Sequence, residues 1–356
     1  MSLYVKIKKS FGSFFLDIEF EAGNEKLALL GSSGCGKSMT LKCIAGIETP
    51  DEGRIVLDGR VLFDTEKKIN LSPQTRCTGL LFQDYAIFPN MTVEQNIKTG
   101  IRERKSKSEK QKIASGIMEK CHLNGLEKHY PSQLSGGQKQ RTALARILVS
   151  QPRIIMLDEP FSALDSFLRW QLEQELSDIL AEFKGTALYV SHNRDEVFRL
   201  CDRIAVIEQG RVNIISEKWA LLKNPQTYPA ALLTGCKNIS SAEKTAHSTI
   251  FAAEWDVEMH GIQAPDDIAF VGIRAKNIHP VSDGEPLSDD YIVFDYTIVS
   301  LSEDTFSKIL IIRLSQSQKS KPIRWEIGKE NYNEAEISMS GRIKIKKSDV
   351  LLLRRE

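Results

Sequence analysis

The glycine-rich segment Gly31 to Ser38 constrains the fold of this chain more than any other feature. It follows the short apolar run 27–30 and fits the pattern G-x-x-x-x-G-K-[ST]. In this pattern glycines let backbone N–H groups turn inward around phosphate oxygens, the lysine meets the terminal phosphates, and the last hydroxyl helps to hold magnesium. A helix is expected from Met39 to Gly46, so its positive N-terminal end faces the same anion. The order strand, loop, helix predicts an α/β fold.

The residues expected to contact the phosphates form one continuous stretch. Inside it, the helix dipole could lower the pKa of the Cys35 thiol, although a tolerated small residue is the simpler interpretation. A glycine-rich turn without any ligand is the alternative for the whole segment. The stretch consists of Gly31, Ser32, Ser33, Gly34, Cys35, Gly36, Lys37, Ser38 and Met39.

Length and composition limit the class of protein. A chain of 356 residues exceeds the roughly 150 of a typical domain, so two domains are expected. The net charge of +1 provides no long-range field for nucleic acid, which is therefore not an expected partner. Apolar runs are far shorter than the roughly 20 residues of a spanning helix, and no secretion signal is recognised, so we expect a cytoplasmic location. The six cysteines show no Cys-x-x-Cys pair, against a zinc site or a disulfide framework.

The chain is expected to contain an α/β domain over 1–235 and a β-rich domain over 236–356. Charged, helix-favouring residues dominate between about 90 and 150, which predicts an inserted helical subdomain. Apolar runs typical of a buried parallel sheet follow. After the loop-like stretch 224–241, short alternating segments predict a small, OB-like β-barrel. The expected strands are 4–8, 13–20, 27–30, 54–57, 154–157, 187–190 and 204–207, and in the tail 292–299, 308–314 and 342–346.

Two carboxylates, Asp158 and Glu159, follow the apolar strand 154–157. Open parallel sheets bind ligands at the carboxyl ends of their strands, and adjacent residues there point in different directions. Asp158 can therefore coordinate magnesium while Glu159 acts as the general base on a water aligned with the γ-phosphate. Taken alone, such a pair is a common surface edge. Together with the phosphate loop, the pair favours catalysis.

A second helix start lies at Leu134 to Gln138, with the letters Leu-Ser-Gly-Gly-Gln. Ser135 and the Gly137 amide would face an anion at this helix end. The alternative is an ordinary glycine turn capped by serine. Two phosphate-seeking helix ends in one chain have a common purpose if they meet across a shared nucleotide.

With these motifs in place, residues 1–235 resemble the nucleotide-binding subunit of an ABC transporter. The phosphate loop, Gln83, the Leu-Ser-Gly-Gly-Gln run, the Asp158–Glu159 pair, Ser162-Ala163-Leu164-Asp165 and His192 occur in the family's order. The resemblance implies a P-loop NTPase fold of the ABC type that hydrolyses ATP with Mg²⁺. It also implies a head-to-tail homodimer, in which ATP lies between the phosphate loop of one chain and Ser135, Gly136, Gly137 and Gln138 of the other.

The same resemblance assigns further roles at the phosphates. Gln83 is expected to touch magnesium and the attacking water, so that the magnesium ligands become Ser38, Gln83 and Asp158. His192 would contact the γ-phosphate and orient Glu159. Asp165 would touch the phosphate loop of the partner chain.

Aromatic residues are candidates for two further contacts. Phe11 is expected to stack on adenine, with Phe14 and Phe15 as competitors. Tyr85, Ile87 and Phe88, shortly after Gln83, could line a groove for a membrane subunit, and core packing is an equal alternative.

The resemblance further implies an importer at the cytoplasmic face of the membrane, with two membrane-spanning permease subunits and a separate substrate-binding protein. The segments 53–64 and 71–74 look most like molybdate-type oxyanion importers. Sulfate, ferric iron and polyamine importers share much of this sequence. The tail could be a sensor for a small anion, although 235–238 is only a distant counterpart of the molybdate-binding run. The rival class is a soluble ABC ATPase that acts on DNA or translation.

Overall fold

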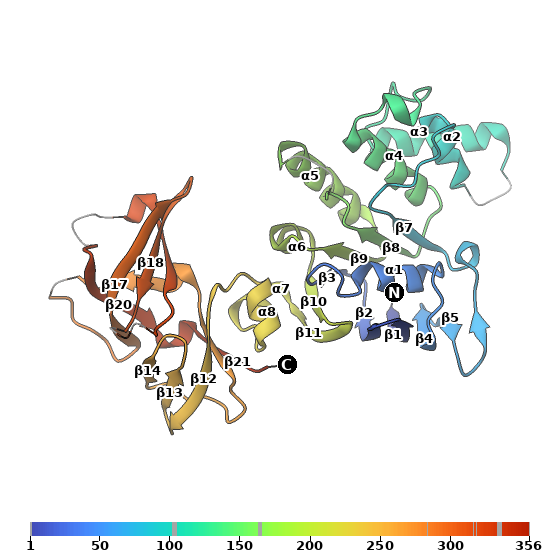
Figure 1. Cartoon of the computed structure of the whole chain (residues 1–356). Coiled ribbons are helices and arrows are strands. Elements are labelled where there is room, and N and C mark those ends of the chain that lie inside the picture. Colours follow the sequence, from blue (N-terminus) through green and yellow to red (C-terminus); the bar gives the residue numbers. More distant parts are fainter. Residues whose placement is uncertain are drawn as a thin grey trace. The chain divides into compact units, whose positions relative to one another are not determined.

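The computed structural model describes residues 2–101, 105–162, 166–282, 284–315, 317, 319–332 and 337–355, with the backbone alone for 166–168. The chain divides into two compact units, Met1–Lys218 and Trp219–Glu356 (Figure 1). The division between Lys218 and Trp219 falls earlier along the chain than the predicted boundary at 235/236.

The earlier boundary has a packing cause inside the second unit. Helix α8 (Tyr228–Leu233) contributes Ala231 to a buried cluster with Leu351 and Leu353 near the end of the chain. The Arg274 guanidinium donates to the carbonyl oxygens of Leu222, at 2.6 Å, and Thr234, at 2.9 Å. Residues 219–235 therefore pack with the second unit, and their loop-like sequence does not separate them from it.

The first unit is built on one sheet of 11 strands in the order β6-β5-β4-β1-β2-β11-β10-β3-β9-β8-β7. Strands β7, β8, β9, β3 and β10 pair in parallel in that succession. The strands are β1 (Leu3–Phe11), β2 (Phe14–Ala22), β3 (Lys26–Leu30), β4 (Glu52–Leu57), β5 (Arg60–Asp64), β6 (Ile69–Asn70), β7 (Thr78–Leu81), β8 (Ile154–Asp158), β9 (Thr186–Ser191), β10 (Arg203–Glu208) and β11 (Arg211–Glu217).

The parallel part of this sheet is buried on both faces, as the continuous apolar runs predict. Every residue of β8 and β9 is buried. Leu41 and Ile44 of helix α1 (Lys37–Ala45) belong to the same core cluster as Met156 and Leu188 of the sheet. This packing fixes α1, and with it the phosphate loop, against the strands.

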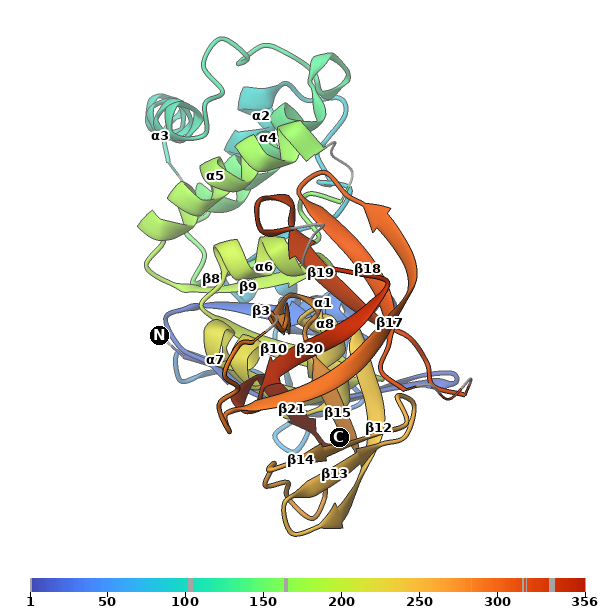
Figure 2. The ribbon, with the colours of Figure 1, turned by 90° about the vertical axis from the view of Figure 1, so that its left-hand side faces the viewer.

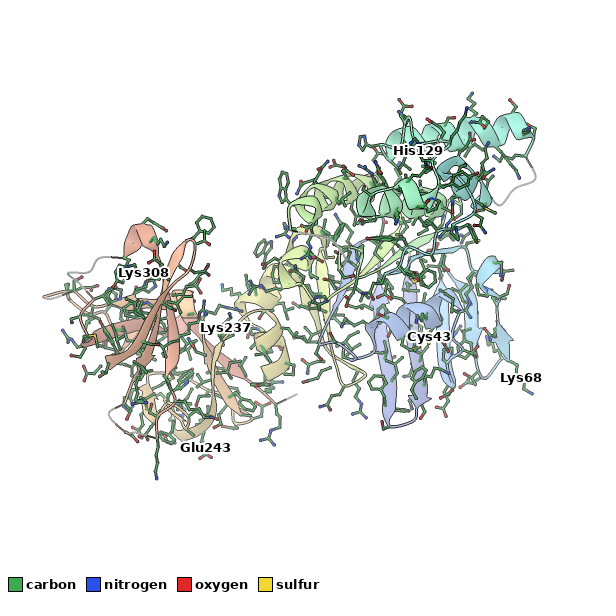
Figure 3. The ribbon with its side chains drawn as sticks, turned by 45° about the horizontal axis from the view of Figure 1, so that its top comes forward. Cys43, Lys68, His129, Lys237, Glu243 and Lys308 are labelled. Carbon is green, nitrogen blue, oxygen red and sulfur yellow. The ribbon has the colours of Figure 1, made fainter. Side chains whose placement is uncertain are left out.

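Arg76 closes the C-terminal end of α1. Its fully buried guanidinium donates from Nη1 to the carbonyl oxygens of Cys43, labelled in Figure 3, and Ile44, at 2.8 and 2.9 Å. Its Nε donates to Leu71 O at 2.8 Å. A cation at this position compensates the negative end of the helix dipole and the carbonyls that the helix leaves unpaired. Gly46 has a φ of +80°, and a Cβ there would lie 2.5 Å from Arg76 Nε.

The expected helical subdomain consists of α2 (Val93–Thr99), α3 (Lys107–Lys120) and α4 (Gly136–Leu148). Figure 1 shows these helices gathered at one end of the first unit. Each starts with a capping box, at Thr92, Ser106 and Ser135. Two more helices, α5 (Ser166–Glu182) and α6 (Arg194–Leu200), belong to the same unit. The subdomain has its own small core of Val93, Ile97, Ala114, Met118, Cys121, Leu123, Leu134, Ala145 and Val149.

The second unit is rich in β-strands, as predicted, and its described residues form two five-stranded sheets. Its helix α7 begins at the division (Lys218–Lys223). The first sheet is β12 (Asn238–Ala246), β13 (Thr249–Ala252), β14 (Val257–His260), β15 (Phe270–Ile273) and β21 (Val350–Leu353). The second, seen in Figure 2, is β16 (Ile278–Pro280), β17 (Tyr291–Glu303), β18 (Ser307–Arg313), β19 (Ile323–Gly328) and β20 (Ser340–Lys346).

The OB-like barrel is therefore not confirmed. The larger apolar cluster of the described residues in this unit includes fully buried Trp325 and draws side chains from both sheets. The Trp325 indole donates to Ile278 O at 2.9 Å and meets the Tyr296 ring edge-on. Across the described residues, no helix is both long and apolar enough to span a membrane.

Candidate active site

Four adjacent parallel strands deliver the predicted catalytic motifs to one edge of the sheet. The phosphate loop follows β3, His192 follows β9, Asp158 ends β8 and Gln83 comes two residues after β7. Because β3, β9, β8 and β7 are neighbours and run in parallel, their carboxyl ends coincide. Segments far apart in the sequence thus meet where ligands bind in open α/β sheets.

The phosphate loop depends on glycines whose backbone other residues adopt poorly. Gly34 and Gly36 have φ values of +80° and +106°. A Cβ on Gly36 would lie 2.5 Å from Leu16 Cδ1, and one on Gly31 would lie 2.3 Å from Ile207 O. No side chain caps the N-terminus of α1 after Gly36. The first amides of this helix are thus available to an anion.

Lys37 is the cation of the loop. It is only 4% exposed, and its Nζ donates to the carbonyl oxygens of Gly31 and Ser32, both at 2.8 Å. These contacts hold the ammonium group inside the loop, where a phosphate would be. Cys35 is buried, and burial raises the pKa of its thiol. It is a small buried residue, as the simpler interpretation had it.

Ser38 and Asp158 form the oxygen pair expected of a magnesium site. Ser38 Oγ donates to Asp158 Oδ1 at 2.7 Å. Burial raises the pKa of the Asp158 carboxyl, and the bond from Ser38 opposes that shift. Among the described residues, no cluster of three or more His, Cys, Asp and Glu could hold a metal ion alone. A hydroxyl and a carboxylate therefore fit a Mg²⁺ ion that takes its other ligands from phosphates and water.

Glu159 and His192 face each other beside the loop. Glu159 Oε2 lies 3.2 Å from His192 Nδ1, and the side chains are 19% and 56% exposed, respectively. Glu159 has a φ of +45°, and its N–H donates to Val190 O on the neighbouring strand at 3.0 Å. Glu159 also borders the pocket formed by Lys37 and Ser38. This arrangement places a carboxylate beside the phosphate loop and a histidine within reach of it, which is the geometry that a general base would need.

Gln83 is exposed and lies at the start of a loop that is hydrogen-bonded to helix α4 of the helical subdomain. Tyr85 and Ala86 have positive φ values of 61° and 43°. The Tyr85 hydroxyl donates to Pro160 O at 3.4 Å, next to the Asp158–Glu159 pair. Arg146 of α4 donates from Nη2 to Tyr85 O at 3.3 Å. The loop after Gln83 is thus tied both to the catalytic edge and to α4.

The two aromatic residues of this loop have different environments. Tyr85 is buried, so core packing describes it, whereas Phe88 is 46% exposed. Asn96 holds Phe88 in place, accepting from its N–H at 2.8 Å and donating to its carbonyl at 3.1 Å. The Arg146 guanidinium lies 5.2 Å from the centre of the Phe88 ring. Asn96 and Arg146 were not predicted to hold this loop, because neither belongs to a local motif.

A pocket of about 420 Å³ adjoins the phosphate loop. Phe11 and Phe14 pair directly across the β1–β2 turn, and both line this pocket. Phe11, predicted to stack on adenine, and its competitor Phe14 thus lie at the same pocket, so the prediction is not decided between them. Phe15 is largely exposed and does not border the pocket. The described lining is Phe11, Phe14, Ser33, Gly34, Gly36, Lys37, Ser38, Met39 and Glu159.

The second predicted anion site lies at the start of α4, away from this pocket. Ser135 Oγ accepts from Gln138 N at 3.3 Å, and Gln138 Oε1 accepts from Ser135 N at 2.9 Å. Ser135, Gly136, Gly137 and Gln138 are absent from the described lining of the pocket. Gly137 packs tightly, since a Cβ there would lie 2.9 Å from Leu172 Cδ1. Asp165 falls outside the described residues.

Comparisons with known proteins agree with this geometry. Residues 16–162 match the family model described as ABC transporter. The sulfate/thiosulfate import ATP-binding protein CysA of Mannheimia succiniciproducens is 40% identical over 249 residues, covering 67% of this chain and 68% of the relative. The spermidine/putrescine import ATP-binding protein PotA of Oleidesulfovibrio alaskensis is 30% identical over 337 residues, covering 90% of this chain and 85% of the relative.

The chain belongs to the ATP-binding subunits of ABC importers. It is an ATPase, and the expectation of an ABC-type P-loop fold is confirmed. Among solved structures, the ATP-binding cassette MJ0796, a dimer bound to ADP and Pi, shares 27% identity with a TM-score of 0.53, covering 61% of this chain and 99% of that chain. The curated relatives named above import sulfate/thiosulfate or polyamines, so the prediction of molybdate is not supported.

Proposed function

We propose that this protein hydrolyses ATP in two composite sites of a head-to-tail homodimer, and that this reaction powers import across a membrane. The observation that carries the proposal is the meeting of Lys37, the Ser38–Asp158 pair and the Glu159–His192 pair at one sheet edge. The phosphate loop binds the β- and γ-phosphates of ATP, and Phe11 or Phe14 stacks on adenine. Ser38, Asp158 and Gln83 would hold a Mg²⁺ ion, which would neutralise phosphate charge.

In this proposal, Glu159 removes a proton from the attacking water, and His192 Nδ1 keeps the carboxylate aligned while the ring reaches the γ-phosphate. The second helix end supports the dimer. Ser135 is exposed and lies outside the described lining of its own chain's pocket, so it is available to the nucleotide of another copy. The similar cassette MJ0796 is a dimer. Asp165 is proposed to touch the partner's phosphate loop.

Dimer formation tests the composite site directly. Glu159→Gln keeps the nucleotide cradle but removes the base, so we expect turnover to fall by about 10²-fold and ATP-bound dimers to accumulate. Adding Ser135→Arg to Glu159→Gln should abolish those dimers while each monomer still binds ATP. Light scattering and nucleotide binding measure both properties. Full turnover by Glu159→Gln would refute the role of Glu159, and hydrolysis by a strictly monomeric protein would refute the shared site.

The transporter itself follows from the family. We propose that two membrane-spanning permease subunits bind the ATPase dimer at the cytoplasmic face of the membrane, and that a substrate-binding protein delivers the solute. The exposed Phe88 ring, held by Asn96 and Arg146 beside the Gln83 loop, is a suitable contact for a permease segment. Phe88→Glu should release the ATPase from permease-containing membranes without changing its unstimulated ATP hydrolysis in solution. Unchanged membrane association would refute this contact.

We propose an oxyanion of the sulfate class as the solute, because the relative CysA at 40% identity imports sulfate/thiosulfate. A polyamine is the second candidate, because the match to PotA covers 90% of this chain and so extends into the second unit. Expression in a host lacking its own sulfate-import ATPase should restore growth on sulfate as the sole sulfur source. Restored spermidine uptake in a polyamine-import mutant, without sulfate growth, would decide for the polyamine.

A further inference from the structure

One buried carboxylate organises the turn that carries His192. Glu196, in the first turn of α6, is only 4% exposed. Its Oε2 accepts from Ser191 Oγ at 2.9 Å and from Tyr189 Oη at 3.1 Å. Its Oε1 accepts from Asn193 Nδ2 at 3.1 Å. Every one of these donors belongs to the end of β9 or to the turn that follows it.

The two residues that flank His192 are both tied to this carboxylate. Ser191 Oγ also accepts from Asn193 N at 2.9 Å, so the two flanking residues are linked to each other as well. Asn193 Oδ1 accepts from Asp195 N at 2.9 Å and thereby caps α6. His192 itself is more than half exposed and has Glu159 Oε2 as its partner, 3.2 Å from Nδ1. Its position is therefore set by the backbone on either side of it.

A carboxylate suits this position in a way that an amide does not. The partners are the hydroxyls of Ser191 and Tyr189 and the side-chain NH₂ group of Asn193, and an ionised carboxylate can accept from all of them. Glutamine has nearly the same shape, but its NH₂ group would face either the Asn193 NH₂ or the two hydroxyls. In the first orientation, two NH₂ groups would face each other. In the second, the Ser191 hydroxyl, which accepts from Asn193 N, would have to turn its hydrogen away from residue 196.

We propose that Glu196 is a positioning residue that holds His192 in register with Glu159. The inference rests on the roles proposed above for Glu159 and His192. Arg169 Nη1 of α5 lies 3.8 Å from Glu196 Oε1 and helps to balance its buried charge. A second buried glutamate offers a matched control. Glu173 of α5 pairs with Arg199 of α6 at 2.7 Å, between the same two helices but outside the His192 turn.

Steady-state ATP hydrolysis by the full chain tests the proposal. Glu196→Gln should lower kcat by about tenfold or more, because a misplaced reacting group is costly, while KM for ATP stays within about twofold. Glu173→Gln should leave kcat close to that of the wild type, although both variants weaken the α5–α6 contact. Thermal melting of both variants measures that shared structural loss.

A double-mutant cycle separates a positioning role from a general one. If Glu196 acts through His192, Glu196→Gln should cause no further loss of kcat in a His192→Ala background. Multiplicative losses, or an equal fall of kcat in Glu173→Gln, would overturn the proposal. Should Glu196→Gln fail to fold, Ser191→Ala removes one of the same bonds and should lower kcat several-fold, again only when His192 is present.

The same kcat measurements separate the positioning role of Glu196 from the catalytic role of His192. Wild-type kcat in His192→Ala would refute the catalytic role proposed for His192, and the positioning role of Glu196 with it. A strong loss in His192→Ala combined with unchanged kcat in Glu196→Gln would refute only the positioning role.

Discussion

The N-terminal ends of α1 and α4 were both predicted to face an anion, but their backbone N–H groups are satisfied in opposite ways. At α1, Gly36 holds a φ of +106° and no side chain caps the helix. At α4, Ser135 and Gln138 satisfy each other's backbone N–H groups in a capping box. The α1 end is therefore completed by a ligand, whereas the α4 end is stable by itself. This difference suits a protein that binds nucleotide with one end and offers the other to a second copy.

The largest expected effect is the loss of the cation at the ligand-dependent end. Lys37→Ala should weaken ATP binding by about 10- to 100-fold, because charge-assisted bonds to phosphate contribute about 1.5–3 kcal/mol. Calorimetric titration of the full chain with ATP measures this. Gln138→Ala, at the self-capped end, is the matched control and should leave monomer affinity unchanged. Equal losses in both variants would contradict the contrast between the two ends.

The second-largest expected effect comes from backbone strain at the N-terminal end of α1. Gly36→Ala forces an alanine into a positive φ and places Cβ 2.5 Å from Leu16 Cδ1. We expect a loss of about 2 kcal/mol or more in unfolding free energy, together with impaired ATP binding. Urea denaturation with and without ATP measures both effects. A fully stable Gly36→Ala protein that binds ATP normally would show that the loop does not need this conformation.

Removing the self-supplied cap should have a smaller effect. Ser135→Ala leaves the Gln138 N–H without its side-chain acceptor, so unfolding free energy should fall by about 1 kcal/mol. Monomer affinity for ATP should not change, since Ser135 is outside the pocket of its own chain. Denaturation curves and titrations on the monomer test this. Weaker ATP binding by a monomeric Ser135→Ala protein would place this helix end in the site of its own chain.

The smallest effect concerns Asp158, beside the α1 end. Burial raises the pKa of its carboxyl, so the folded state takes up this proton more readily than the unfolded chain. Wild-type stability should thus gain from this group as pH falls through its folded-state pKa. Asp158→Asn removes the buried charge and should raise the melting temperature slightly at neutral pH, with the difference vanishing in acid. A lower melting temperature at neutral pH would contradict this sign.

The motifs that could be predicted from sequence are those whose residues are neighbours in the chain. The phosphate loop, the Asp158–Glu159 pair and the capped start of α4 are local patterns, and the structure places them on the expected elements. Their convergence could be inferred because parallel strands end at one edge. Arg146, Asn96 and Glu196 could not be found in this way, since each acts through contacts made across the fold.

Other predictions had physical limits. Alternating residues in the tail specify strands with one buried face, but they do not specify which strands pair, so the two five-stranded sheets of the described residues could not be foreseen. Phe11 and Phe14 could not be ranked, because a tight turn between β1 and β2 places both at the same pocket.

At the opposite end of α1, the missing side chain of Gly46 is the space that the Arg76 guanidinium fills. The two positions therefore depend on each other, because the Arg76 guanidinium fits only while position 46 has no side chain. A bulkier residue at position 46 would expel the arginine, and a shorter one at position 76 would leave a void and remove a donor from the carbonyl oxygens of Leu71, Cys43 and Ile44. An engineered change at the C-terminal end of α1 must therefore alter positions 46 and 76 together.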